Sequence, residues 1–289
     1  SFHHHFRNGD HIINNVLDKL AEMGFKNLTL AASSLSAVHA PLIEHIRSGL
    51  ITHIETSGLR GELAEQISRG LMDFPVVFRS HGGRASAIRS GELHIDVAFL
   101  GAPSCDPYGN ANGYSRDDDD GISCGSLGYA RTDAEFADKV IIITNNIVSY
   151  PNAPWAIPEH DVDYVVRVDD IGDPKGIMSG ATRYTKDPKE LLIAKTAANV
   201  VEAAGYLYDG FSMQMGSGGA SLATARFIRQ KMLDKGIRCR FALGGITGQI
   251  TAMHEEGLID RILDVQSFDL DAAKSLKNNH FHHQISATY

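Results

Sequence analysis

The glycine-rich segment Gly216-Ser217-Gly218-Gly219 is the part of this sequence that most directly suggests chemistry. It follows an apolar, strand-like run and precedes a helix-like one, so its backbone N–H groups stand at the start of a helix. Glycine allows a ligand to approach the backbone closely, and a helix N-terminus favours negative charge. Gly216, Gly218 and Gly219 are therefore predicted to line a pocket for a phosphate or for the oxyanion of a reacting carbonyl group. The alternative is a glycine-rich turn without a ligand.

A second glycine segment, Gly244-Gly245-Ile246-Thr247-Gly248, comes directly after the next strand-like run. In open α/β sheets, ligands bind beyond the carboxyl ends of the strands. The two segments would then form one backbone-lined pocket, with Gly244 and Gly245 on its second wall. A tight turn without a ligand is again the alternative.

Two arginines next to polar loops could bind an anion. Arg7 follows three histidines and stands before a helix-like segment, and Arg84 ends the segment Ser80-His81-Gly82-Gly83-Arg84. The planar guanidinium group of arginine binds carboxylates through paired hydrogen bonds. His5 and His81 stand close to these arginines. Successive histidines on a strand point to opposite faces, so the three before Arg7 cannot all bind one metal ion. Ordinary surface turns are the alternative for both segments.

Alternating strand-like and helix-like segments must position these loops. Most of the apolar runs are continuous, as in parallel strands that are covered on both faces. The clearest helix is predicted over Pro188–Ala204, with Asp187 as its N-cap and Gly205 at its end. Strands are predicted near the start of the chain and at residues 27–32, 51–55, 95–100, 140–144, 164–168, 211–215, 237–243 and 262–265. The alternation predicts an α/β fold with mainly parallel sheets.

The overall composition excludes several classes of protein. The 289 residues carry 27 Lys and Arg against 35 Asp and Glu, a net charge of −8, so the chain lacks the basic surplus of a nucleic-acid binder. No apolar run reaches the ~18 residues of a membrane span. The three cysteines form no Cys-x-x-Cys pair, and the acidic run 117–120 lacks the carboxylates of a calcium loop at its first and twelfth positions, so no metal is predicted. We expect a cytoplasmic enzyme or binding protein.

An internal repeat divides the chain. The segments that begin at Phe2 and at Phe211 each start a strand–loop–helix–strand unit. Further along, Gly49-Leu50-Ile51 matches Gly257-Leu258-Ile259 at nearly the same offset. We interpret this as two copies of one α/β domain, of which the second is incomplete. Both ends of the chain are expected to be cut.

Several longer motifs together resemble the alpha chains of citrate lyase, the citrate CoA-transferase subunits, over essentially the whole sequence. The motifs are SFHHHFRNGD from Ser1, SGLRGELAEQISRGL from Ser57, SHGGR from Ser80, GELHIDVAFLGAPSCDPYGNANGY from Gly91, CGSLGYA from Cys124, ELLIAK from Glu190, GFSMQMGSGGASLATARF from Gly210, ALGGITG from Ala242 and DVQSFD from Asp264. The resemblance implies tandem CoA-transferase-type (NagB/RpiA-like) α/β domains. Together with the repeat, it predicts a first domain over residues 1–180 and the N-terminal part of a second over residues 181–289.

The resemblance also implies an activity and partners. A protein of this kind acts in the cytoplasm with the beta (lyase) and gamma (acyl carrier) chains of citrate lyase. The carrier bears a CoA-like thiol prosthetic group, for which acetyl-CoA can substitute. The acetyl group on this thiol would be exchanged for citrate, which gives a citryl thioester and acetate. No metal, nucleic acid or membrane is implied.

One departure from the wider CoA-transferase family bears on the mechanism. Many of its members carry a nucleophilic glutamate in a Ser-Glu-Asn-Gly stretch, whereas the matching stretch here is Gly245-Ile246-Thr247-Gly248-Gln249, without a carboxylate. A covalent glutamyl thioester is therefore not expected. Direct attack of a citrate carboxylate on the acetyl thioester, through a mixed anhydride, needs positioning and oxyanion stabilisation but no protein nucleophile.

The positions of the loops then suggest roles for the residues named above. The five glycines Gly216, Gly218, Gly219, Gly244 and Gly245 would supply the thioester pocket, and Arg7, Arg84, His5 and His81 would bind citrate. Two other classes of function stay open on the residues alone. A nucleotide-dependent oxidoreductase would need an acidic residue at the end of the strand before Gly244, and a non-catalytic ligand-binding scaffold could share the same fold.

Overall fold

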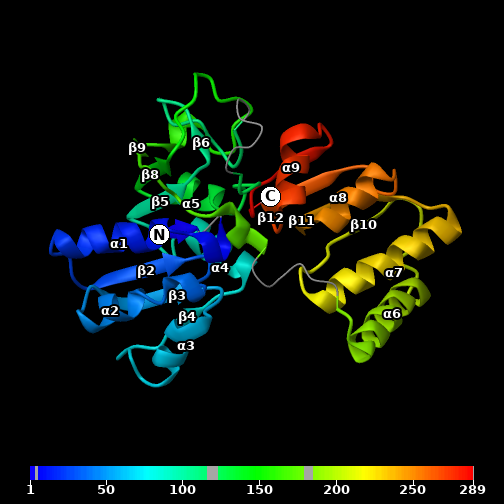
Figure 1. Ribbon diagram of the computed structural model, residues 1–289, viewed down its shortest axis with the longest axis horizontal. Coiled ribbons are helices and arrows are strands. Elements are labelled where there is room, and N and C mark those ends of the chain that lie inside the picture. Colours follow the sequence, from blue (N-terminus) through cyan, green and yellow to red (C-terminus); the bar gives the residue numbers. More distant parts are fainter. Residues whose placement is uncertain (4–5, 116–122, 179–184, 289) are drawn as a thin grey trace.

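The computed structural model describes residues 1–3, 6–115, 123–178 and 185–288. Within these ranges the chain forms two separate parallel sheets with helices packed on them, which confirms the predicted α/β fold (Figure 1). The first sheet and its helices occupy one side of the molecule. The second sheet lies beside them, and the C-terminal end of the chain lies between the two units (Figure 1).

The first sheet has seven strands in the order β4-β3-β2-β1-β5-β8-β9, all parallel. Its strands are β1 (Phe2–His3), β2 (Leu28–Ala32), β3 (Ile51–Thr56), β4 (Val77–Phe78), β5 (Val97–Gly101), β8 (Lys139–Thr144) and β9 (Tyr164–Arg167). The short strands β6 (Ser104–Cys105) and β7 (Ala111–Asn112) form a separate antiparallel pair. Because β1, β2 and β3 are neighbours and parallel, the segments that follow them meet at one edge of the sheet.

The second sheet has four parallel strands in the order β10-β11-β12-β13. They are β10 (Phe211–Met213), β11 (Cys239–Ile246), β12 (Ile262–Ser267) and β13 (His282–Gln284). The order repeats that of β1-β2-β3-β4 in the first sheet, with helices between successive strands in both. The proposed boundary at residue 180 stays a prediction, because it falls among residues 179–184, outside the described ranges.

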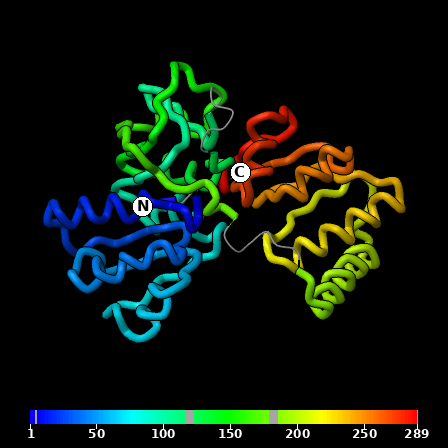
Figure 2. The backbone as a smooth tube through the Cα atoms, viewed as in Figure 1, coloured from blue at the N-terminus to red at the C-terminus, as the bar shows by residue number. Residues whose placement is uncertain are grey.

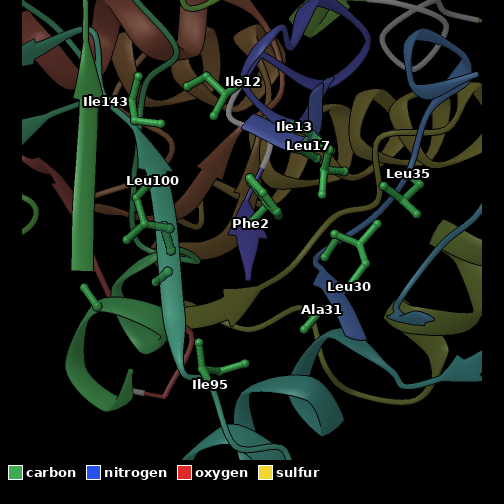
Figure 3. Packing of buried hydrophobic residues seen from close by; sticks show 14 of the residues in the cluster. Phe2, Ile12, Ile13, Leu17, Leu30, Ala31, Leu35, Ile95, Leu100 and Ile143 are labelled. Atoms are coloured by element: carbon green, nitrogen blue, oxygen red, sulfur yellow. The ribbon is translucent and has the colours of Figure 1, made fainter. Parts of the chain in front are cut away.

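The helices alternate with the strands along the chain. They are α1 (Ile12–Glu22), α2 (Leu42–Arg47), α3 (Gly61–Ser68), α4 (His81–Ser90), α5 (Arg131–Phe136), α6 (Pro188–Ala203), α7 (Gly219–Lys235), α8 (Gly248–Glu255) and α9 (Leu270–Asn278), with short 3₁₀ turns η1 (Arg7–Gly9), η2 (Ala37–His39), η3 (Glu159–Asp161) and η4 (Pro174–Met178). The first core packs Phe2 of β1 among Ile13 and Leu17 of α1 and Leu30 of β2 (Figure 3). A second, separate core lies around β11.

The local signals read from the sequence explain how several of these elements begin and end. The Asp187 side chain accepts a hydrogen bond from Lys189 N (2.8 Å) and caps α6, as predicted. Asp10 Oδ2 accepts from Ile13 N (3.1 Å) at the start of α1. The end of β11 differs from the prediction: the strand continues through Gly244 and Gly245 to Ile246. Parallel pairing with β12 carries it past the two glycines, with a shift of register between them.

One segment of the first unit joins the two sheets. It covers Cys124–Ala130 and runs along β12: Ser126 Oγ donates to Asp264 O (2.7 Å), and Tyr129 N donates to Val265 O (3.1 Å). The backbone tube shows the same proximity of the C-terminal segment to the first unit (Figure 2). These hydrogen bonds fix the two sheets relative to each other, so residues at their carboxyl ends can share one site.

Candidate functional site

Arg7 lies where the two units meet. It follows β1 in the 3₁₀ turn η1 and has a φ of 54°, a left-handed conformation that is uncommon for a non-glycine residue. Its Nη1 donates to Ile177 O (3.3 Å), and its guanidinium lies 5.1 Å from the centroid of the Phe268 ring. Phe268 directly follows β12 of the second sheet. A cation from the first unit thus stacks on an aromatic ring from the second.

The charge on Arg7 is only partly compensated. Burial lowers the pKa of Arg7, and the positive charge of Arg60 lowers it further. Among the described residues, Arg7 has no carboxylate partner; its contacts are a carbonyl oxygen and an aromatic face. A cation in such surroundings favours the binding of an anion. The left-handed backbone at Arg7 costs of order 1–3 kcal/mol, and strain of this kind concentrates at ligand-binding positions. We define Arg7, Arg60 and Phe268 as the junction site.

The glycines of β11 shape this site in a way that the sequence did not predict. A Cβ atom at Gly245 would overlap the Phe268 ring, and one at Gly244 (φ +96°) would lie 2.7 Å from Gln214 Nε2. The space beside each glycine is therefore filled by a side chain of the protein itself. Gly244 and Gly245 thus lie inside β11 rather than in a loop after it, and their assignment to the backbone-lined pocket stays a prediction. Gly245 instead allows Phe268 to lie flat against β11 and under Arg7.

The loop before α7 is open, in contrast to β11. Among the described residues, a Cβ atom at Gly218 would meet nothing within 4 Å, and one at Gly216 would meet only Ser221. Gly218 is the N-cap of α7 and no side chain caps this helix. Gly219 begins the helix. The backbone N–H groups of the first turn are thus available to an acceptor, at the carboxyl end of β10 and on the same edge of the second sheet as Phe268.

Arg84 lies elsewhere, inside the first unit. Only 1% of its surface is exposed, and its Nη1 and Nη2 donate to the two Asp133 carboxylate oxygens at 2.9 and 2.6 Å. Burial acts to lower the pKa of Arg84, but the Asp133 carboxylate outweighs it and raises the pKa. The sequence interpretation of Arg84 as a citrate ligand fails physically, because the guanidinium fork is already filled by an internal carboxylate.

Of the two histidines predicted to bind citrate, the structure describes His81 but not His5. His81 begins α4, and its ring packs edge-on against Tyr129, with centroids 5.6 Å apart. Burial and then the charge of Arg84 lower its pKa, which favours the neutral form of His81. Its contacts thus place it beside the Arg84 pair, and none of those seen among the described residues reaches the junction site. His5 lies outside the described residues.

One set of side chains in the described ranges could hold a metal ion. His94, Asp96 and Asp138 offer ligand atoms within 4.8 Å of one another, and all three are exposed. Asp96 and Asp138 directly precede β5 and β8, so this set lies at the amino-terminal edge of the first sheet. Arg7 lies at the opposite, carboxyl edge, and the set therefore takes no part in the junction site.

Sequence reasoning missed two members of the junction site. Arg60 follows β3 in the Ser57-Gly58-Leu59-Arg60-Gly61 stretch, and Phe268 follows β12. A basic residue in the segment after a parallel strand is a signal that could have identified Arg60. No local signal identifies Phe268, because its role depends on a contact with the other unit.

No helix among the described residues is long and apolar enough to cross a membrane.

Comparison with known proteins places the chain among characterised sequences. The family model for citrate lyase, alpha subunit (CitF), matches residues 1–289. The citrate lyase alpha chain of Haemophilus influenzae is 58% identical over 287 residues, which are 99% of this chain and 57% of the relative. The chain thus spans a little over half the length of the curated relatives it matches.

A search of solved structures also finds a citrate lyase alpha subunit. A structure described as the alpha subunit of citrate lyase from Streptococcus mutans, in complex with citrate, superposes with a TM-score of 0.93 at 56% identity and covers 99% of this chain and 56% of that one. A 4-hydroxybutyrate CoA-transferase from Porphyromonas gingivalis has a TM-score of 0.55 at 17% identity, with 94% of this chain and 67% of that one covered. The latter likeness shows the fold alone.

Proposed function

The chain belongs to the citrate lyase alpha subunit family, and we propose on that premise that it exchanges the acetyl group of an acyl thioester for citrate. One observation carries the proposal: the Arg7 guanidinium, which has no carboxylate partner among the described residues, lies over Phe268 where the two sheets meet. The similar Streptococcus mutans structure is described as a complex with citrate, a ligand of the charge that Arg7 would attract. An oxidoreductase is disfavoured, because β11 ends in Gly244-Gly245-Ile246 rather than in an acidic residue.

The proposed reaction needs no nucleophile from the protein. A citrate carboxylate attacks the acetyl thioester carbonyl, the thiolate leaves, and an acetyl–citryl mixed anhydride forms. The thiolate then attacks the citryl carbonyl of the anhydride and acetate leaves, which gives the citryl thioester. No net proton is taken up or released. Arg7 would hold citrate, while the N–H groups of the open Gly216–Gly219 loop would stabilise the oxyanion formed in each step.

The wider assembly is also part of the proposal. The thiol would be the CoA-like prosthetic group of an acyl carrier (gamma) chain, with acetyl-CoA as its substitute. A lyase (beta) chain would cleave the citryl thioester, and the compartment would be the cytoplasm. Because the chain spans a little over half the length of its curated relatives, the exchange step is tested first, without the proposed partner chains.

A single-turnover exchange with labelled citrate tests the chemistry. Protein in excess over acetyl-CoA is mixed with citrate whose carboxylates carry ¹⁸O, and the acetate is analysed by mass spectrometry. Direct attack predicts one ¹⁸O atom in the acetate of the first turnover. A protein carboxylate as nucleophile would give unlabelled acetate in that turnover, and the intact mass of the protein incubated with acetyl-CoA would increase by the CoA thioester.

The variant Gly218→Val tests the assigned pocket. The Cβ position at Gly218 is open and its φ is −71°, so the fold should tolerate valine, while the side chain would cover the start of α7. We expect exchange to fall by at least ~10²-fold, the size of effect produced by losing an oxyanion donor, with the denaturation midpoint unchanged. Exchange at the parent rate would remove this loop from the site, and no exchange by the parent chain would overturn the proposed function.

A further inference from the structure

The segments after β1, β2 and β3 bring a second arginine to the edge of the sheet where Arg7 lies. Arg60 follows β3 and is the N-cap of α3. In the sheet, β2 separates β1 from β3, so the ends of β1 and β3 are two strand spacings apart, or roughly 10 Å. Two extended arginine side chains can converge across that distance on one ligand.

The segment after β2 holds both arginine-bearing turns in place. Asn8 Oδ1, next to Arg7, accepts a hydrogen bond from Val38 N (3.1 Å). On the other side, Arg60 N donates to Leu35 O (3.0 Å), and a Cβ atom at Gly61 would lie 3.0 Å from Ala37 Cα. The turns that carry Arg7 and Arg60 are thus packed against the same short stretch, which limits their separation through the Asn8 side chain on one side and the backbone of Arg60 and Gly61 on the other.

Neither arginine is neutralised within the protein. Arg79 and Arg84 show the ordinary pattern, because each donates to carboxylates at less than 3 Å. In the ranges that the structure describes, neither Arg7 nor Arg60 has an ion pair with a carboxylate, and Arg60 is exposed. Two uncompensated like charges close together repel each other, and a bound anion that contacts both would remove this repulsion.

We propose that Arg60 is a specificity-determining residue that, together with Arg7, selects a ligand with at least two carboxylates. This inference rests on the proposed function and deepens it. Arg7 would bind one carboxylate of the ligand and Arg60 a second. Acetate, the product that leaves, could engage only one of the two, so the pair favours citrate over acetate at the same edge of the sheet.

The closing experiment compares ligands that differ in their number of carboxylates. Affinities for citrate, tricarballylate, glutarate and acetate are measured by calorimetry with the parent chain and with Arg60→Gln, Arg60→Lys and Arg69→Gln. Arg69 is the matched control: it lies at the other end of α3, and within the described ranges its side chain makes one surface ion pair, with Glu65 (3.9 Å). Denaturation midpoints of all variants are recorded, and we expect them to be equal because the Arg60 side chain makes no cap hydrogen bond.

We expect Arg60→Gln to weaken citrate, tricarballylate and glutarate by roughly tenfold to a hundredfold, the value of a charge-assisted hydrogen bond, and to leave acetate unchanged. Arg60→Lys should recover part of the loss, and Arg69→Gln should match the parent. Equal citrate affinity in Arg60→Gln and Arg69→Gln would overturn the inference, as would a parent chain that binds none of the polycarboxylates. Arg60-dependent binding without acyl exchange would support it while the proposed function fails.

Discussion

Arg7 and Arg84 lie in two regions of the molecule that stabilise a guanidinium cation in different ways. Arg84 is buried in the first unit and its guanidinium is filled by both oxygens of Asp133. Arg7 lies between the units, where it contacts a carbonyl oxygen and the Phe268 ring. The first arrangement buries the cation against its own carboxylate, away from a ligand in solvent. The second keeps a cation in place without neutralising it, which is what a site for an anionic substrate requires.

The largest expected effect on stability comes from replacing Arg84, and it is compared with the replacement of Arg7. Arg84→Ala should lower the free energy of unfolding by about 3–5 kcal/mol, because it leaves the Asp133 carboxylate buried without its partner. Citrate affinity of the folded protein should stay unchanged. Asparagine tolerates a left-handed backbone, so Arg7→Asn should keep the free energy of unfolding of the parent. Its citrate affinity should fall. Urea unfolding and citrate calorimetry on both variants provide the measurement.

A double variant controls for simple loss of packing at Arg84. In Arg84→Met/Asp133→Leu both charges are removed, so the double variant should be more stable than Arg84→Met alone. A double variant less stable than the single one would show that the ion pair is not the source of the effect. Weaker citrate binding by folded Arg84→Ala would restore Arg84 to the site.

A smaller effect is expected from the contrast between the filled and the open glycine. Gly245→Ala places a methyl group in the Phe268 ring, whereas Gly218→Ala places it more than 4 Å from every other described residue beyond its chain neighbours. Overpacking of this kind costs typically 1–3 kcal/mol, so Gly245→Ala should lose about that much stability, and citrate affinity should fall as Phe268 moves from Arg7. Gly218→Ala should stay within ~0.5 kcal/mol of the parent. Equal unfolding curves for the two variants would contradict the packing of Phe268 on β11.

These contrasts show which features the sequence could predict. Continuous apolar runs and caps such as Asp187 act over a few residues, so the strands, the start of α6 and the α/β class followed from the sequence. The Arg84–Asp133 pair joins residues 49 positions apart, and the Arg7–Phe268 contact joins two units of the chain. No local pattern reveals such partners. The sequence therefore identified both arginines as candidate anion ligands. Whether each one forms an internal ion pair or stays available to a ligand depends on tertiary contacts.

The smallest expected effect is a difference in how two buried carboxylates, Asp133 and Asp264, make stability depend on pH. Neither Asp133 nor Asp264 is exposed to solvent. Burial acts to raise the pKa of Asp133, but Arg84 outweighs it and lowers the pKa. Burial raises the pKa of Asp264, and the His282 and Ser267 hydrogen bonds (3.1 and 2.6 Å) offset it only in part. One carboxylate is held in its charged form and the other is pushed toward its neutral form.

The signs of the two contributions to stability are therefore opposite. The stabilisation from Asp133 is present above the unfolded pKa, near 3.9, and is lost as the pH falls through its lowered folded pKa. The contribution of Asp264 is present below the unfolded pKa and is lost as the pH rises through its raised folded pKa. Relative to the parent, Asp264→Asn should thus gain stability as the pH rises from 4 to 8, and Asp133→Asn should lose stability as the pH rises from 2 to 5. Urea unfolding across these ranges measures both differences. Parallel curves for Asp264→Asn and the parent would contradict the raised pKa of Asp264, because they would mean that Asp264 is ionised at the same pH in the folded and unfolded chain.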